Sequence, residues 1–247
     1  NGEVEFASAQ PDLEAQLLSF PTGEIDAPNA LAYAIPMRPG LPIYDGFTVG
    51  HVADSALAYR GSPFYLAFNA QRSLVTAALV QYAQGRLSVL TDYVREGEAA
   101  VVAKDIVREA GLLCRANVRP VCGPQHWEQY NNVGLVQSLR KIPLDVDRGT
   151  APDRGREFLR DELGKLTRGE PAVQIGRAAA TTLNALAGGY CRMPGRDGRL
   201  SLDPDEGIYR TLMEGLESCL GTMAMMADVD DEANVAYTAQ GQRYRRY

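Results

Sequence analysis

The side chains that most often carry out chemistry are few and widely spread in this 247-residue chain. It has only two histidines, His51 and His126, so a Ser-His-Asp triad or a histidine-rich metal site is not expected. No GxxxxGK[ST] segment is present to cradle nucleotide phosphates. The four cysteines form no CxxC pair, which argues against a zinc site or a disulfide framework: Cys114, Cys122, Cys191 and Cys219.

Two short segments have both a functional and a structural interpretation. His126-Trp127-Glu128 follows an expected strand, at the place where α/β sheets bind ligands. A lone histidine beside the only tryptophan is, however, more often a packing residue. Gly188-Gly189-Tyr190 could contact a phosphate, but a helix C-cap explains the glycine pair better.

Composition indicates a soluble globular protein. Lys and Arg total 25 against 31 Asp and Glu, a formal net charge of −6, which excludes a generally basic nucleic-acid coat and leaves a local basic face open. No stretch approaches the roughly 18 apolar residues of a membrane span, and no basic segment precedes an apolar run at the N-terminus. We therefore expect no membrane partner, no export signal and a reducing cytosolic setting.

The pattern of apolar residues predicts a mixed α/β sheet. Three apolar runs at 64–68, 74–82 and 87–94, joined by short polar connections, predict an antiparallel meander. Helical spacing and turn residues predict the later elements: a helix over 96–111 ending at Gly111, a strand over 114–122, a helix over 155–166, a strand over 171–175, and helices over 177–186 and 207–226. The order is β-β-β-α-β-α-β-α. The Pro- and Gly-rich residues 41–62 are expected to form a connector on the surface.

Residues 13–34 read LEAQLLSFPTGEIDAPNALAYA. They resemble the C-terminal "QLL-FP-G-hDD-DALAYA" pattern of the nuclease domain of tailed-phage large terminases, whose aspartate belongs to a metal site. Asp26 matches the first acidic position, Ala27 replaces the second, and Asn29 stands near the third. The resemblance implies that residues 1–40 are the last segment of an upstream terminase nuclease domain. Taken alone, Asp26 is explained as a helix N-cap.

Residues 62–226 resemble, by their layout, the RNase H-like core of the same nucleases. In that family acidic residues stand at the ends of the first and fourth strands and on the last helix. The matching positions here are Asn69, Cys122 and Glu214, with Glu217 one helical turn further on. The resemblance implies an RNase H-like domain over 63–226 whose active site is largely degenerate.

Two-metal cleavage of phosphodiesters needs several carboxylates that converge on Mg²⁺ or Mn²⁺. One carboxylate among three expected positions predicts weak metal binding and impaired catalysis. Asn69 is then a turn residue and Cys122 a small buried side chain. The alternative is an active metal-dependent endonuclease with a shifted site, for which Asp26, Asp92 and Glu214 are the candidate metal ligands, with Gln125, Glu128 and Glu217 nearby.

The region 140–199 is locally basic, with twelve Lys and Arg against eight Asp and Glu. Such a region could follow a DNA backbone. Its candidate DNA-binding residues are Arg154, Arg156, Arg160 and Arg177. The alternative is a solvated helical face with interleaved ion pairs.

Residues 227–247 are expected to form a polar tail. Taken together, the resemblance implies part of a phage or prophage DNA-packaging large terminase in the bacterial host cytoplasm. Its partners would be double-stranded DNA and the portal or other terminase domains. A purely structural or oligomerisation module is a further alternative.

Overall fold

The computed structural model describes residues 40–59, 61–116, 118–127, 134–140, 146–194, 199–201, 203–204 and 206–243. The motif at 13–34, including Asp26, lies outside the described residues, as does Glu128. None of the described helices is both long and apolar enough to cross a membrane.

A three-stranded antiparallel meander forms the centre of the sheet, as the sequence predicts. Its strands are β3 (Phe64–Gln71), β4 (Leu74–Ala83) and β5 (Arg86–Glu96). The β4–β5 turn has positive φ at both Gln84 (55°) and Gly85 (71°), the geometry that matches the twist of a tight hairpin.

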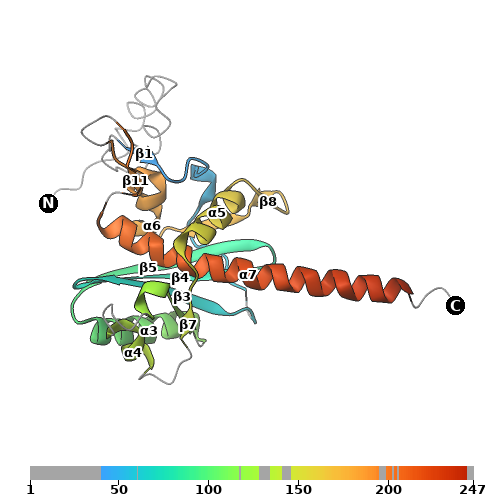
Figure 1. Ribbon diagram of the computed structural model, residues 1–247, viewed down its shortest axis with the longest axis horizontal. Helices are drawn as coiled ribbons and strands as arrows, with labels where there is room; N and C mark the ends of the chain where they lie inside the picture. The colour runs from blue at the N-terminus through green and yellow to red at the C-terminus, as the bar shows by residue number, and fades with distance from the viewer. Residues whose placement is uncertain are drawn as a thin grey trace.

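Parallel strands extend the meander on both sides and give a seven-stranded sheet of order β2-β10-β5-β4-β3-β6-β7 (Figure 1). Beside β3 lie β6 (Val118–Cys122) and β7 (Asp147–Arg148), both parallel to it. Beside β5 lie β10 (Val173–Gly176) and β2 (Val52–Ala53). The mixed α/β fold expected from the sequence is confirmed, and the order β5-β4-β3-β6-β7 is that of an RNase H-like sheet.

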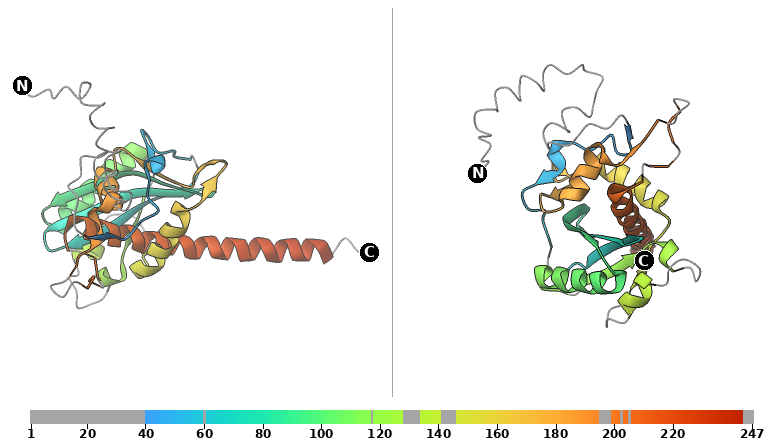
Figure 2. Two further views of the ribbon diagram at one scale, coloured as in Figure 1. Left: turned by 90° about the horizontal axis from the view of Figure 1, so that it is seen from above. Right: turned by 90° about the vertical axis from the view of Figure 1, so that its left-hand side faces the viewer.

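Helices cover both faces of this sheet (Figures 1 and 2). Strand residues alternate between the faces, so Leu66 and Phe68 of β3 face one layer while Tyr65 and Ala67 face the other. The first layer contains α3 (Ala99–Cys114) and α4 (Gly134–Arg140). The second contains α5 (Pro152–Leu163), α6 (Ala180–Asn184) and α7 (Ile208–Arg243).

The long helix α7 packs directly across the central strands. The predicted stripe of Leu212, Leu216 and Leu220 is confirmed, since all three are fully buried in the core beneath α7. The backbone of α7 continues as a helix to Arg243 and extends past the edge of the sheet (Figure 1). The segment expected as a polar tail is therefore helical up to that residue.

Several predicted boundaries are wrong. Helix α3 does not stop at Gly111 but continues to Cys114, because Arg115 adopts the left-handed conformation (φ 50°) and caps the helix through a bond to the Gly111 carbonyl. The following strand consequently begins at Val118 rather than at Cys114. Strand β7 was not predicted, because two residues carry no detectable alternation.

The segment 41–62 does not lie on the surface as a simple connector. Its strand β1 (Leu41–Pro42) pairs with β11 (Cys191–Arg192), and β2 joins the main sheet. Ile43, Tyr44 and Phe47 are buried in the core beside α5 and α7. Proline and glycine marked the turns correctly, but the apolar residues between them contribute to the core. A short hairpin of β8 (Leu166–Thr167) and β9 (Glu170–Pro171) completes the described elements.

Candidate functional site

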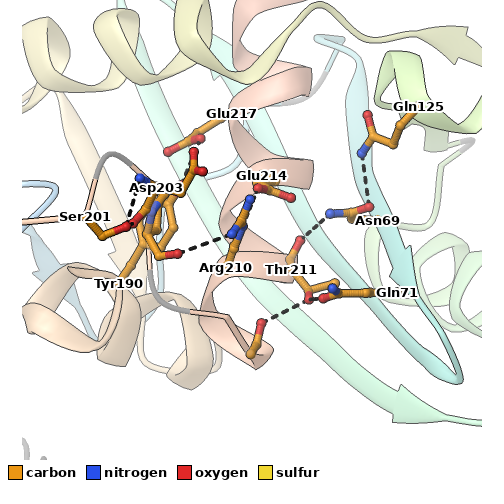
Figure 3. A network of polar contacts seen from close by, with 12 residues as sticks. Asn69, Gln71, Gln125, Tyr190, Ser201, Asp203, Arg210, Thr211, Glu214 and Glu217 are labelled. Atoms are coloured by element: carbon orange, nitrogen blue, oxygen red, sulfur yellow. Dashed lines mark hydrogen bonds and ion pairs between the residues drawn. The ribbon is translucent and has the colours of Figure 1, made fainter. Parts of the chain in front are cut away.

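A cluster of uncharged polar side chains lies where β3 and β6 end side by side (Figure 3). Because the two strands are parallel, their carboxyl ends meet at one edge of the sheet, and α7 crosses that edge. We call the residues gathered there the Asn69 cluster: Asn69, Gln71, Gln125, His126 and Thr211. The cluster stands at the edge where the sequence resemblance placed catalytic carboxylates.

The amide of Asn69 is fully hydrogen-bonded although its side chain is buried. Its Nδ2 donates to the carbonyl of Thr211 in α7 at 2.8 Å. Its Oδ1 accepts from the backbone N–H of Ala70 (2.9 Å), from Gln125 Nε2 (3.2 Å) and from His126 Nε2 (2.7 Å). A backbone N–H needs an acceptor and a carbonyl needs a donor, so the two neighbours fix the orientation of the amide. The position therefore requires a side chain with one donor and one acceptor.

Close packing holds α7 against this residue. A Cβ added to Gly215 would lie 3.0 Å from the Cβ of Asn69 and 3.1 Å from the carbonyl carbon of Phe68. Burial lowers the pKa of His126, which keeps the ring neutral, with the Nε2 proton directed at Asn69. Thr211 Oγ1 lies 3.0 Å from Gln71 Oε1, which ties the same turn of α7 to the last residue of β3.

Cys122 does not take part in this cluster. It pairs with Phe68 across β3 and β6, and its side chain is buried in the core on the α3 side of the sheet, opposite to the Asn69 cluster. Burial raises the pKa of the thiol, so the side chain remains neutral. The expected convergence of Asn69, Cys122 and Glu214 is thus incorrect for Cys122, whose place beside Asn69 is taken by Gln125 and His126.

Glu214 is an ion-pair partner rather than a free carboxylate. Arg210 Nε lies 2.7 Å from Glu214 Oε1 one helical turn away, and both side chains are about one quarter exposed. Arg210 also donates to the carbonyl of Pro204. The pair anchors the start of α7 to the preceding loop.

Glu217, the other predicted acid on α7, is fully buried in a separate network. Arg156 of α5 approaches its two oxygens with Nε at 3.2 Å and Nη2 at 2.9 Å. Tyr44 donates to Oε1 at 2.6 Å, and Tyr190 donates to Oε2 at 3.3 Å. Burial raises the pKa of Glu217, and the hydrogen bonds from Arg156 and Tyr44 offset part of that rise. All the acceptor capacity of this carboxylate is used within the protein.

Asp92 lies on β5 and holds α6 in place. Its Oδ2 accepts from the backbone N–H of Thr182 (2.6 Å) and from the Thr182 hydroxyl (3.0 Å), so it caps the first turn of α6. Burial raises its pKa, and the bonds from Thr182 counteract that rise. No hydrogen bond between described residues connects Asp92 with the Asn69 cluster.

The four candidate DNA-binding arginines differ in how they are held. Arg156 binds Glu217, and Arg160 donates to the carbonyl of Ile43 from Nε (3.2 Å) and Nη2 (3.1 Å). Both arginines are therefore structural anchors. Arg154 is exposed, and Arg177 is 71% exposed beside the equally open Asp54.

The described residues do not form a carboxylate metal centre. Among them no three His, Cys, Asp or Glu side chains are grouped so as to hold a metal ion. The Asn69 cluster offers two amides and one imidazole, and these groups are already hydrogen-bonded to one another. Such a neutral set does not fit two Mg²⁺ or Mn²⁺ ions, which need anionic oxygens.

Comparison with known proteins identifies the fold. No protein-family model and no curated protein matches the chain. Among solved structures, a full-length large terminase from a thermophilic bacteriophage matches with a TM-score of 0.57 at 12% identity, over 74% of this chain and 45% of that one. The large terminase nuclease of the thermophilic phage G20c, solved with bound magnesium, matches with a TM-score of 0.51 at 7% identity, over 74% of this chain and 97% of that one.

The two coverages locate the shared region. The match spans less than half of the first terminase but nearly all of the G20c nuclease. It therefore corresponds to the nuclease part of a large terminase. The described residues adopt the RNase H-like fold of large-terminase nuclease domains, as the sequence resemblance implied.

The Arg156–Glu217 pair predicts a specific stability defect. Replacing Arg156 by Leu should destabilise the protein by about 3 kcal/mol at neutral pH, because it leaves a buried carboxylate without its cation. The defect should shrink toward acid. A carboxyl with a raised folded-state pKa contributes its stability below its ordinary pKa near 4.5 and loses it as the pH rises.

Urea unfolding at several pH values measures this effect. Arg108→Leu is the matched control, since Arg108 also pairs with an aspartate three residues earlier but is 71% exposed. The control should change stability by less than about 0.5 kcal/mol. A pH-independent loss in Arg156→Leu would show that the buried carboxylate is not responsible.

Restoring an aspartate at position 69 should be unfavourable. In Asn69→Asp an anionic oxygen would replace the donor that now lies 2.8 Å from the Thr211 carbonyl, at a cost of about 2 kcal/mol. Protonation of that aspartate would restore the donor. The difference in melting temperature from the wild type should therefore be large at neutral pH and become smaller below the ordinary aspartate pKa of about 3.9. Equal stability of variant and wild type at pH 7 would contradict this account of Asn69.

Proposed function

We propose that this chain is part of a DNA-packaging large terminase and that its RNase H-like domain does not cleave DNA but makes contacts with DNA, the portal or neighbouring terminase domains. The fold shared with the two phage terminases supports the terminase role. The Asn69 cluster carries the rest of the proposal. At the edge of the sheet where acidic residues are expected, it presents an amide held by Thr211, Gln125 and His126.

The argument against cleavage is electrostatic. Two divalent cations about 4 Å apart repel each other strongly, and only several converging carboxylates hold them together. Of the predicted acids in the described part of the chain, Glu214 is paired with Arg210, Glu217 with Arg156, and Asp92 with the amino end of α6. None of the three is a free anion facing Asn69.

Plasmid cleavage tests this part of the proposal. The full chain should leave supercoiled plasmid intact in Mg²⁺ and in Mn²⁺, while the G20c large terminase nuclease is assayed in the same buffers as the positive control. Metal-dependent nicking that is lost in Glu214→Ala would establish instead an active endonuclease with a shifted site. Nicking that persists in Glu214→Ala would place the active site on other residues, and it would also overturn the proposal.

DNA contact depends on the exposed arginines. Because Arg156 and Arg160 anchor the fold, the proposed contact falls to Arg154 and Arg177. The double variant Arg154→Glu and Arg177→Glu should weaken binding to duplex DNA at least tenfold at low salt and make the dependence on salt less steep. Fluorescence anisotropy over a salt series measures both, and Lys104→Glu, an exposed cation on α3, is the control. Unchanged binding in the double variant would leave protein partners as the proposed contacts.

A further inference from the structure

An apolar groove lies at the end of the sheet opposite to the Asn69 cluster. It runs between residues 55–64, the middle of β5 and the carboxyl end of α3, and its volume is about 1070 Å³. Phe64, the first residue of β3, lines it, whereas Asn69 lies near the other end of the same strand. Its lining is largely apolar and includes Ala56, Pro63, Leu90 and Leu113.

The surface around this groove is unusually apolar for an exposed helix end. Leu112 and Leu113, in the last turn of α3, are 73% and 62% exposed. Leu57, on the facing segment, is 48% exposed. A second, shallower concavity lined by Val107, Leu112 and Val118 adjoins the groove, and the two share Arg115 and Ala116. Contiguous exposed apolar surface of this kind marks an interaction site.

The charges at the rim are positive. Arg115 lines both concavities, and Arg108 lines the second one. Arg108 pairs only with the exposed Asp105 in the described chain, and Arg115 has no ion pair there. An occupant that suits this surface combines apolar side chains with carboxylates.

The chain itself contains such a segment. Between residues 226 and 237, within α7, the sequence spaces Met226, Val229, Ala233 and Tyr237 at helical intervals, and four acidic residues stand at 228 and 230–232. The backbone of this part of α7 extends past the sheet, away from the rest of its own chain (Figures 1 and 2).

We propose that the groove beside α3 binds the C-terminal part of α7 of a second copy of this chain. The size agrees, since two turns of a helix about 10 Å wide fill roughly 850 Å³, comparable with the groove. The charges agree as well, because acidic residues of α7 would meet Arg108 and Arg115. If the exchange is reciprocal it gives a symmetric dimer, and if it is not it gives a ring or an open chain. The proposal stands apart from the proposed loss of cleavage.

Light scattering coupled to size exclusion tests the proposal on the full chain. The full chain should show a mass above that of the monomer that falls on dilution, and a chain ending at Met226 should be monomeric. Removal of residues 1–39 should leave the association unchanged. A monomeric full chain, or association that survives the truncation at Met226, would overturn the proposal, and loss of association on removing residues 1–39 would assign the interface to that segment instead.

Charge reversal identifies the contact itself. Arg115→Glu should weaken self-association at least about fivefold, and Asp230→Lys together with Glu232→Lys should restore part of it in the same chain. Lys104→Glu is the matched control, because it makes the same change on the same helix and Lys104 lines neither concavity. Equal effects of Arg115→Glu and Lys104→Glu, or no rescue by the acidic-to-basic changes, would show that the groove is not the contact.

Discussion

The ion pair between Arg156 and Glu217 is the interaction on which the layer of α5, α6 and α7 depends. A carboxylate with no exposed surface is tolerated only if donors surround it, because an unpaired charge in the interior is very costly. The donors come from three places in the chain: α5, the segment before β2, and the residue that precedes β11. Forming the pair therefore fixes all three against α7 at once.

Glycine makes this arrangement possible. A Cβ at Gly155 would overlap the carbonyl of Glu217, and a Cβ at Gly221 would collide with the Thr150 hydroxyl. Helices α5 and α7 thus approach so closely that their backbones nearly touch, which brings Arg156 within reach of Glu217. The same closeness excludes water from the pair and strengthens it, since the local dielectric constant is low.

The sequence predicts the sheet better than the site, and for physical reasons. Alternating apolar residues define β3, β4 and β5, and the apolar stripe of α7 is evident from spacing alone. Strands of two residues, such as β2 and β7, are created by pairing with longer neighbours and leave no pattern in the sequence. The boundary at Cys114 was missed because Arg115 adopts a left-handed conformation that glycine would have signalled.

For the site, residue type and position were predictable, but not the partners. Asn69 was placed correctly at the end of a strand, and its contact with the backbone of α7 could not be foreseen because it joins residues 142 positions apart. The position of Cys122 shows the limit of aligning strand ends, since a shift of one residue moves a side chain to the other face of a sheet. A missed signal was Gln125-His126 itself: two adjacent polar residues after a strand at which an acidic residue was expected.

The neutral character of the Asn69 cluster follows from how α7 is held. Successive turns of the helix already have assigned contacts: Arg210 pairs with Glu214, Thr211 accepts from Asn69, Gly215 allows the close approach to β3, and Glu217 binds Arg156. A metal centre at the same edge would need anions in place of the donors that now bind the helix carbonyl, and the helix would lose its attachment to β3. The loss of acidic residues and the tight docking of α7 are thus two sides of one arrangement, in which hydrogen bonds from neutral side chains hold the helix against the sheet edge.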